Sequence, residues 1–355
     1  MDKNDRNLNK KLTSLEIAKM AGVSRSTISR VINGYSNVPK ETHDRVMAVI
    51  REHDYYPHLS GQLLVGKKTK TIGLFWIGNY GSIISDNLSS SYLVHVIEAA
   101  GRLGHLTLTC ILENLSDAAN VNWVKMAFIQ GRIDAGIFIG VNNDEPLIEE
   151  LISGGHIVGI FDHYHPNKQE PNRISVNFEK DTGCMIAKYL YDMGHRRVAF
   201  LHGDDNRYSS VARKEGFLRT MEKQGIRIKP EWLCLGGIEQ LQGYAAASDM
   251  IRKAVKAKDL PTAIFANNDS VAFGVYEALR DANISIPEQI SVIGIDGHSH
   301  MVYPALTTYA FDYNDVFTSL VARTIAAVDG VEDNPTTEFV DGQLIERDSC
   351  KRVVL

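Results

Sequence analysis

Apolar positions near the N-terminus recur at helical spacing in two short runs that a glycine separates. The first run begins with Thr13 and Glu16, whose spacing is that of a capping box at the start of a helix. Gly22 provides the left-handed backbone that a sharp turn needs, and Ser24 is placed to cap a second helix over residues 25 to about 33. The pattern therefore predicts a helix-turn-helix. The apolar residues expected to form the buried stripe of the first helix are Leu15, Ile17, Ala18 and Ala21.

The second of these helices is expected to have one apolar face and one polar face. Ile28, Val31 and Ile32 form the apolar face. In a helix-turn-helix the second helix lies in the major groove of DNA, where its first side chains meet base edges. A plain helical hairpin with a solvated polar face is the alternative that the helix pair leaves open. The candidate DNA-contacting residues on this helix and its caps are Ser24, Arg25, Ser26, Thr27, Ser29, Arg30 and Asn33.

A third helix is predicted to start near Pro39, because proline is favoured in the first turn of a helix. From Thr71 onward short apolar runs alternate with segments of helical period, which predicts a parallel sheet with covered faces. The alternation starts again after Arg173. The predicted fold class is therefore an all-α head on an α/β body, and the body is expected to form two doubly wound parallel-sheet lobes. The chain is expected to cross between the lobes near residues 175–177, 308–312 and 330–335.

Charge is divided unevenly along the 355 residues. Residues 1–70 hold 13 lysines and arginines against seven aspartates and glutamates, whereas the remainder holds 25 against 36. A basic head on an acidic body fits a protein whose head meets phosphates. The four cysteines are far apart without zinc-ligand spacing, so reduced thiols are expected. The polar N-terminal segment and the lack of an apolar run of transmembrane length favour a cytoplasmic protein that does not enter a membrane.

Polar residues follow several of the predicted strands of the body. Ligands of open α/β sheets bind beyond the carboxyl ends of the strands, so these residues are candidates for a ligand site. Carboxylates, amides and an arginine there offer donors and acceptors for the hydroxyl groups of a sugar. Asp269 is equally suited to cap a helix, and Trp76 and Phe161 are either stacking partners for a ring or core residues. The candidate effector-binding residues are Asp162, Ser209, Arg213, Ile238, Asn268 and Asp296.

The chain resembles the lactose/galactose repressor family of bacterial transcription regulators. The resemblance rests on the run from residue 16 to 75, EIAKMAGVSRSTISRVINGYSNVPKETHDRVMAVIREHDYYPHLSGQLLVGKKTKTIGLF, and continues through GHRRVAF, SSVARKEGF, FANNDSVAFG and VIGIDG. It implies a repressor that binds a pseudo-palindromic operator as a homodimer. It also implies a body similar to periplasmic sugar-binding proteins, with a sugar or sugar derivative between the lobes as allosteric effector. The alternative is a family member controlled by a phosphocarrier protein or by a non-sugar corepressor.

The resemblance also implies roles for single residues. Arg25 and Ser26 match positions that contact bases, and Arg213 matches the family's ligand-contacting arginine. Residues 59–65 match a hinge that becomes helical on operator DNA, where Leu64 wedges between base pairs. His58 and Gln62 are expected beside it on the DNA, although His58 stands where many relatives have Asn.

The sequence thus predicts a disordered arm over residues 1–12, a helix-turn-helix domain over 13–57 and a hinge with linker over 58–70. The body, residues 71–355, is expected to have an N-terminal lobe of about 71–175 and 310–330. The C-terminal lobe is expected to span about 178–307 and 333–355.

An enzyme is disfavoured because the chain lacks a phosphate-binding GxxxxGKS/T loop, a Gly-x-Ser-x-Gly elbow and a His-Glu-x-x-His motif. His163 and His165 have chelating spacing, as do His298 and His300, but no third ligand is evident in the sequence. Neither a metal nor a cofactor is therefore predicted.

Overall fold

The computed structural model describes residues 12–56, 68–78, 87–168, 170–178, 180–298, 302–331 and 336–353. The chain divides into two units, Met1–Thr69 and Lys70–Leu355, and each is described by itself. The predicted arm and the hinge residues His58, Gln62 and Leu64 lie outside the described residues, apart from Leu12 at the end of the arm.

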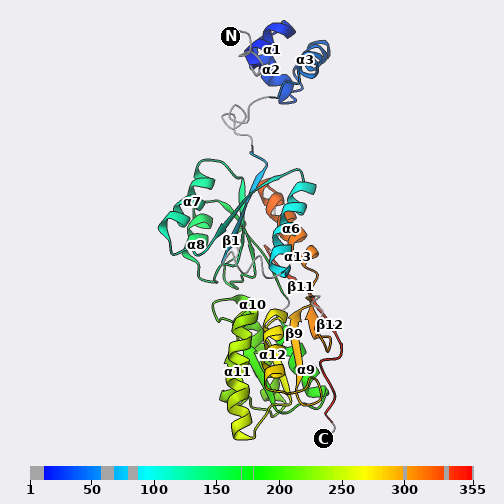
Figure 1. The fold of residues 1–355 in the computed structure, drawn as a ribbon. Helices are drawn as coiled ribbons and strands as arrows, with labels where there is room; N and C mark the ends of the chain where they lie inside the picture. The colour runs from blue at the N-terminus through cyan, green and yellow to red at the C-terminus, as the bar shows by residue number, and fades with distance from the viewer. Residues whose placement is uncertain are drawn as a thin grey trace, which may run out of the picture. The chain divides into compact units, whose positions relative to one another are not determined.

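The head contains α1 (Ser14–Ala21), α2 (Arg25–Ile32) and α3 (Lys40–Glu52), which begin where the sequence predicts their caps (Figure 1). Thr13 and Glu16 form the predicted capping box, in which the Glu16 carboxylate accepts the Thr13 N–H at 2.7 Å. Gly22 ends α1 with a φ of 66°, and Ser24 Oγ accepts the N–H of Thr27 at 3.1 Å. These local bonds determine where α1 stops and where α2 starts.

A small apolar core holds these helices together. Leu15 was predicted to join it, but the side chain is 53% exposed. The reason is helical geometry, because Leu15 and Ile17 are about 200° apart around a helix of 3.6 residues per turn. The buried core consists of Ile17, Ala18, Ala21, Ile28, Val31, Val46 and Tyr55.

The first lobe of the body is a parallel sheet in the order β11-β5-β4-β3-β1-β2, with helices on both faces (Figure 1). Neighbouring residues of β1 point to opposite faces, as expected of a strand. Leu74 packs in the cluster that includes α6 and α13, whereas Phe75 packs with α7 and α8. The elements are β1 (Thr71–Ile77), α6 (Asn87–Arg102), β2 (Leu106–Leu112), α7 (Ala118–Ile129), β3 (Ala135–Ile139), α8 (Pro146–Ser153), β4 (Ile157–Phe161), β5 (Arg173–Phe178), α13 (Tyr313–Val328) and β11 (Thr337–Val340).

The second lobe repeats this plan with the strand order β12-β10-β9-β8-β6-β7, in which only the pairing of β12 with β10 is antiparallel among the described strands. The predicted fold class, an all-α head on a body of two α/β lobes, is confirmed. The elements are α9 (Thr182–Asp192), β6 (Val198–His202), α10 (Tyr208–Lys223), η1 (Pro230–Trp232), β7 (Leu233–Leu235), α11 (Gln240–Ala257), β8 (Ala263–Ala266), α12 (Asp269–Asp281), β9 (Ser291–Asp296), β10 (Thr307–Ala310) and β12 (Gln343–Ile345).

The chain passes between the lobes after β5, after β10 and after β11. The first two passages lie close to the predicted positions. The third prediction was wrong, because it placed residues 333–355 in the second lobe. In the structure β11 pairs with β5 of the first sheet, so the passage lies between Val340 and Gln343. A four-residue edge strand has too short a pattern to be recognised from sequence alone.

Within the described parts of the chain, no helix combines the length and the apolar character needed to span a membrane.

Packing of α9 against α10 gives the first testable prediction. A Cβ placed on Gly183 would fall 2.1 Å from the backbone oxygen of Arg213, so only glycine fits there. Gly183→Ala should lower the free energy of unfolding by about 1–3 kcal/mol, as overpacking does, in urea denaturation.

Gly101→Ala on α6 is the matched control, because a Cβ there meets none of the described atoms within 4 Å. It should be neutral or stabilising by up to about 1 kcal/mol, since alanine is the better helix former. Equal stability of Gly183→Ala and wild type would contradict the close approach of the two helices.

Candidate nucleic-acid interface and ligand cleft

The outer face of α2 is basic and rich in hydroxyl groups. Arg25, Ser26, Ser29 and Arg30 are exposed, and α2 contains no acidic residue. The Oγ atom of Ser24 lies 2.7 Å from that of Ser26, and Arg25 Nε donates to Ser14 Oγ at 3.0 Å. The predicted DNA-contacting residues of α2 therefore share one solvent-facing surface that can meet phosphates and base edges.

The other predicted DNA-contacting residues of the head, Thr27 and Asn33, are less exposed and also make contacts within the head. Thr27 and Asn33 are half-buried, and Asn33 Nδ2 donates to Ser29 Oγ at 3.2 Å. Arg45 of α3, which the sequence analysis did not single out, donates from Nε to the carbonyl oxygen of Ala21 at 3.0 Å. This bond links α3 to the end of α1 and so helps to hold the helix-turn-helix together.

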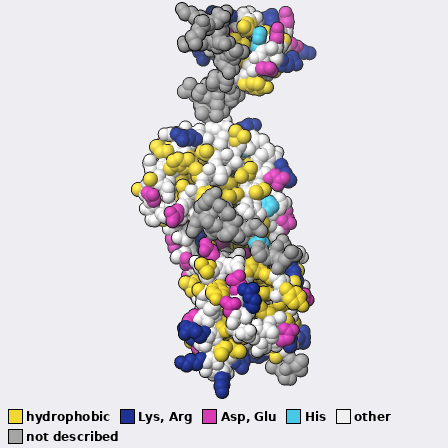
Figure 2. Space-filling model, in the orientation of Figure 1, with side chains coloured by type: hydrophobic (Ala, Val, Ile, Leu, Met, Phe, Trp, Pro, Cys, Tyr) yellow, Lys and Arg dark blue, Asp and Glu magenta, His cyan; other side chains and the backbone are white. Residues whose placement is uncertain are grey.

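A cavity of about 620 Å³ lies between the two lobes of the body, at the carboxyl ends of strands from both sheets. This is where the ends of parallel strands are expected to place a ligand. Both acidic and basic side chains are visible on the second lobe near the boundary between the lobes (Figure 2). The cavity brings together every effector-binding residue that the sequence predicts, namely Asp162, Ser209, Arg213, Ile238, Asn268 and Asp296.

The wall that the first lobe contributes is aromatic. The rings of Tyr92 and Tyr313 stack with centroids 4.8 Å apart, and the ring of Phe161 meets Tyr92 edge-on at 5.6 Å. Trp76 and Phe161 were candidates from the sequence, whereas Tyr92, Phe178 and Tyr313 were missed. They come from α6, β5 and α13, and their local sequence shows only apolar periodicity. The aromatic residues that the first lobe contributes to the lining are Trp76, Tyr92, Phe161, Phe178 and Tyr313.

The wall that the second lobe contributes is polar. Arg213 of α10 is buried, donates from Nη1 to the carbonyl oxygen of Asn267 at 2.9 Å, and has Nη2 3.9 Å from Asp296 Oδ1. Arg213 Nε and Asn267 Oδ1 are buried and have no hydrogen-bond partner among the described residues. A donor and an acceptor are thus left for a polar ligand, because leaving such groups unpaired is costly.

Comparison with known protein families finds a match for the head and a match for the body. Residues 13–58 match the family described as bacterial regulatory proteins, lacI family, and residues 187–350 match the periplasmic binding protein-like domain. The HTH-type transcriptional repressor PurR of Pasteurella multocida is 28% identical over 299 residues, which cover 83% of this chain and 86% of that protein.

The chain combines a LacI-family DNA-binding domain with a periplasmic-binding-protein-like domain.

Solved structures share the fold. The Lac repressor dimer bound to operator and the anti-inducer ONPF has a TM-score of 0.78 at 23% identity, covering 96% of this chain and 100% of that one. The transcriptional regulator CelR in complex with cellobiose has a TM-score of 0.71 at 20% identity, covering 95% and 99%. The LacI-family head and the repressor relatives identify the chain as a DNA-binding transcriptional regulator with a ligand-binding domain, and these relatives are regulators rather than enzymes.

Two buried carboxylates of this regulator join the lobes across the cleft. Asp162 of the first lobe accepts the N–H of Ser209 at 2.9 Å and its hydroxyl at 2.7 Å. Asp296 of the second lobe accepts the hydroxyl of Tyr313 at 2.7 Å. Burial raises the pKa of Asp162, and burial together with the Asp296 charge raises that of Tyr313, which keeps its hydroxyl a donor.

The backbone at both carboxylates is unusual. Asp162 has a φ of 59° and Asp296 a φ of 120°, in the half of conformational space that residues with side chains rarely adopt. Such conformations persist where surrounding contacts over-determine them, and they concentrate at functional sites. The cleft thus combines uncommon backbone geometry with buried charge.

Asn268 has a structural function in the cleft. Its Oδ1 accepts the N–H of Val271 at 2.7 Å, so Asn268 and not Asp269 caps α12. Its Nδ2 donates to the carbonyl oxygen of Ile238 at 2.9 Å, which holds the loop that carries Ile238. Asp269 is buried behind the cleft and accepts the Thr308 hydroxyl at 2.8 Å. Burial and the nearby Asp296 charge raise the pKa of Asp269.

The bond between Tyr313 and Asp296 can be tested by removing one oxygen atom. Tyr313→Phe should lower the free energy of unfolding by about 1.5–3 kcal/mol, because a buried carboxylate loses a donor. Urea denaturation of the full chain measures this. Tyr303→Phe, at a side chain that is 94% exposed, should leave stability unchanged. The same midpoint for Tyr313→Phe and Tyr303→Phe would rule out a stabilising bond between the lobes.

Proposed function

We propose that this regulator is a sequence-specific repressor whose operator binding is controlled allosterically by a small carbohydrate in the cavity between the lobes. The observation that supports this most directly is the asymmetry of the cavity, in which most aromatic rings come from the first lobe and most hydrogen-bonding groups from the second. A sugar ring has apolar faces and a rim of hydroxyls, which suits such a pair of walls. The volume of about 620 Å³ is in the range of small-molecule sites.

The charges in the cavity favour an uncharged sugar over a phosphorylated one. Four carboxyl groups line the cavity, those of Asp162, Glu239, Glu277 and Asp296. Two arginines, Arg207 and Arg213, oppose them. A phosphate would meet more like charges than opposite ones, which disfavours binding. The CelR structure contains cellobiose, a neutral sugar, which supports the same choice.

Control by the effector would act through the bonds that join the lobes. Ser209, Arg213 and Asp296 line the cavity, and two of them, Ser209 and Asp296, also form hydrogen bonds between the lobes. A ligand that competes with or reinforces these bonds shifts the arrangement of the lobes, and the coupling is reciprocal between ligand and DNA. A non-sugar corepressor or a phosphocarrier protein would be the controlling partner if no sugar binds.

We also propose that the protein works as a homodimer in the cytoplasm, one head on each half of a pseudo-palindromic operator. The first lobe exposes apolar side chains on α6 and on the edge strand β2, and hydrophobic side chains are visible on this lobe in Figure 2. Exposed apolar patches are typical of protein interfaces. The Lac repressor structure with the shared fold is a dimer on operator. The exposed residues are Val94, Ile97, Leu106 and Ile111.

The DNA-binding assignment predicts how Arg25 acts. Arg25→Ala should relax the preference for one guanine of the operator, at a cost of about 1–3 kcal/mol, because arginine pairs with guanine through two hydrogen bonds. Binding of an operator series with single base changes, at one fixed salt concentration, measures this. Arg51→Ala removes the same charge from α3 and should leave the base preference as it is. An unchanged preference in Arg25→Ala would exclude it as a base contact.

The cleft assignment is tested first by a thermal-shift screen of neutral sugars, sugar phosphates and purines, because a ligand of the native state raises its stability. The binder is then measured by calorimetry. Arg213→Ala should bind it roughly 10- to 100-fold more weakly, as expected when a hydrogen bond to a charged group is lost. Arg252→Ala, an exposed arginine on α11, is the control and should bind as wild type. Wild-type affinity in both Arg213→Ala and Asp296→Asn would refute the proposed site.

A further inference from the structure

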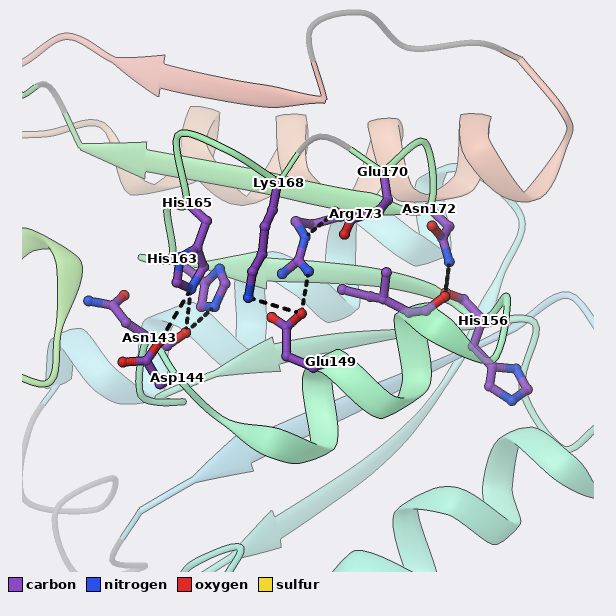
Figure 3. A network of polar contacts seen from close by, with 11 residues as sticks. Asn143, Asp144, Glu149, His156, His163, His165, Lys168, Glu170, Asn172 and Arg173 are labelled. Carbon is purple, nitrogen blue, oxygen red and sulfur yellow. Dashed lines mark hydrogen bonds and ion pairs between the residues drawn. The ribbon is translucent and has the colours of Figure 1, made fainter.

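A second group of ligand-type side chains lies in the first lobe, outside the residues that line the cleft (Figure 3). Glu149 comes from α8, and His163 and His165 come from the segment after β4. One potential ligand atom of each residue lies within 4.8 Å of those of the other two. The sequence predicted no metal because the histidine pair lacked a third ligand, and the fold supplies that ligand from a separate element.

A shared hydrogen-bond acceptor fixes the tautomer of both histidines. Both Nε2 atoms lie within hydrogen-bond distance of the carbonyl oxygen of Asn143, at 2.9 Å from His163 and 2.7 Å from His165. A carbonyl oxygen only accepts, so each ring donates from Nε2–H and keeps a lone pair on Nδ1. His163 is 1% exposed, and its Nδ1 has no hydrogen-bond partner among the described residues. Metal-binding histidines commonly donate their other N–H to a carbonyl in this way.

The carboxylate of Glu149 is also held by hydrogen bonds on one side and left without a partner on the other. Its Oε2 accepts hydrogen bonds from Arg173 Nη2 at 2.9 Å and lies 3.2 Å from Lys168 Nζ. Its Oε1 is buried and has no hydrogen-bond partner within the described part of the chain. Glu170 also pairs with Arg173 at 2.8 Å, so the arginine charge is shared between two carboxylates. One oxygen is therefore held in place by the protein while the other is left open, as in ligating carboxylates.

We propose that His163, His165 and Glu149 together bind one divalent transition-metal ion of the zinc class. Two imidazole nitrogens and one carboxylate oxygen suit Zn²⁺ and exclude Mg²⁺ and Ca²⁺ as preferred ions, because those favour oxygen ligands. Zinc ligands lie about 2.0–2.2 Å from the ion, so on binding the ligand atoms must move closer together than the 4.8 Å within which they lie here. Water completes the coordination, as it does at zinc sites with three protein ligands.

The position of this metal site links it to the boundary between the lobes. The N–H of Asn143 donates to the carbonyl oxygen of Asn206 in the second lobe at 3.0 Å, and the carbonyl of the same residue orients both histidines. His163 directly follows Asp162, and the ring of Tyr164 meets that of Tyr208 at 5.4 Å. A bound ion would therefore order the stretch of the first lobe that contacts the second.

The experiment is a titration of the metal-free full-length protein with Zn²⁺ by calorimetry and with Co²⁺ by visible absorption. The expected result is one ion per chain, with the intense Co²⁺ bands of four- or five-fold coordination. Zn²⁺ at about a hundred times its Kd should also raise the unfolding midpoint by roughly 5 °C. His165→Ala, at a half-buried side chain, should weaken binding at least about a hundredfold, and His53→Ala, an exposed histidine of the head, should not change it.

Glu149→Gln is a second variant that keeps the size of the side chain and should also lose the ion, with folding checked by circular dichroism. Absence of saturable Zn²⁺ and Co²⁺ binding to the wild type would overturn the proposal. Equal affinity in wild type, His165→Ala and Glu149→Gln would also overturn it. Arg173 Nη1 is also buried without a hydrogen-bond partner among the described residues. A crystal soaked with zinc that shows only a water bonded to this atom and to Glu149 Oε1 would overturn the proposal and assign both atoms to a structural water.

Discussion

Hydrogen bonds to two buried carboxylates hold the lobes of the body together around the cleft. Asp162 and Asp296 each accept a bond from a residue of the opposite lobe, at distances of 2.7–2.9 Å. A buried carboxylate is costly unless it is paired, so each of them favours an arrangement in which its donor stays within reach. The shape of the cavity, the position of its aromatic wall and the access of a ligand to Arg213 all depend on that arrangement.

The parallel topology explains why these groups meet at all. Asp162 follows β4 and Asp296 ends β9, and each sits at the carboxyl edge of its own sheet. The two carboxyl edges face the same cavity. Because the chain passes between the sheets three times, neither lobe is built from a single continuous segment. Tyr313 illustrates the consequence, since it begins a helix of the first lobe directly after a strand of the second.

The proposed metal site and the effector cleft share one short stretch of backbone. Asp162 contacts the second lobe, and the next residues supply the ring of Tyr164 and the two histidines that Asn143 orients. Any ligand that orders this stretch acts on the boundary between the lobes, whether it binds in the cavity or beside α8. Such coupling through a shared element requires only that the ligand prefer one arrangement of the lobes.

Local patterns in the sequence were enough to predict the head, the α/β body and the polar strand ends that line the cleft. Capping pairs, a turn glycine and alternating apolar runs depend on neighbours a few residues away, so they can be recognised without a fold. The tertiary structure decided the features that depend on distant residues. It alone assembled the aromatic wall from α6, β5 and α13, used the amide of Asn268 to anchor the loop that carries Ile238, and paired β11 with β5. It also brought Glu149 to the two histidines. Contacts between segments far apart in the chain leave no spacing or periodicity in the sequence that could have indicated them.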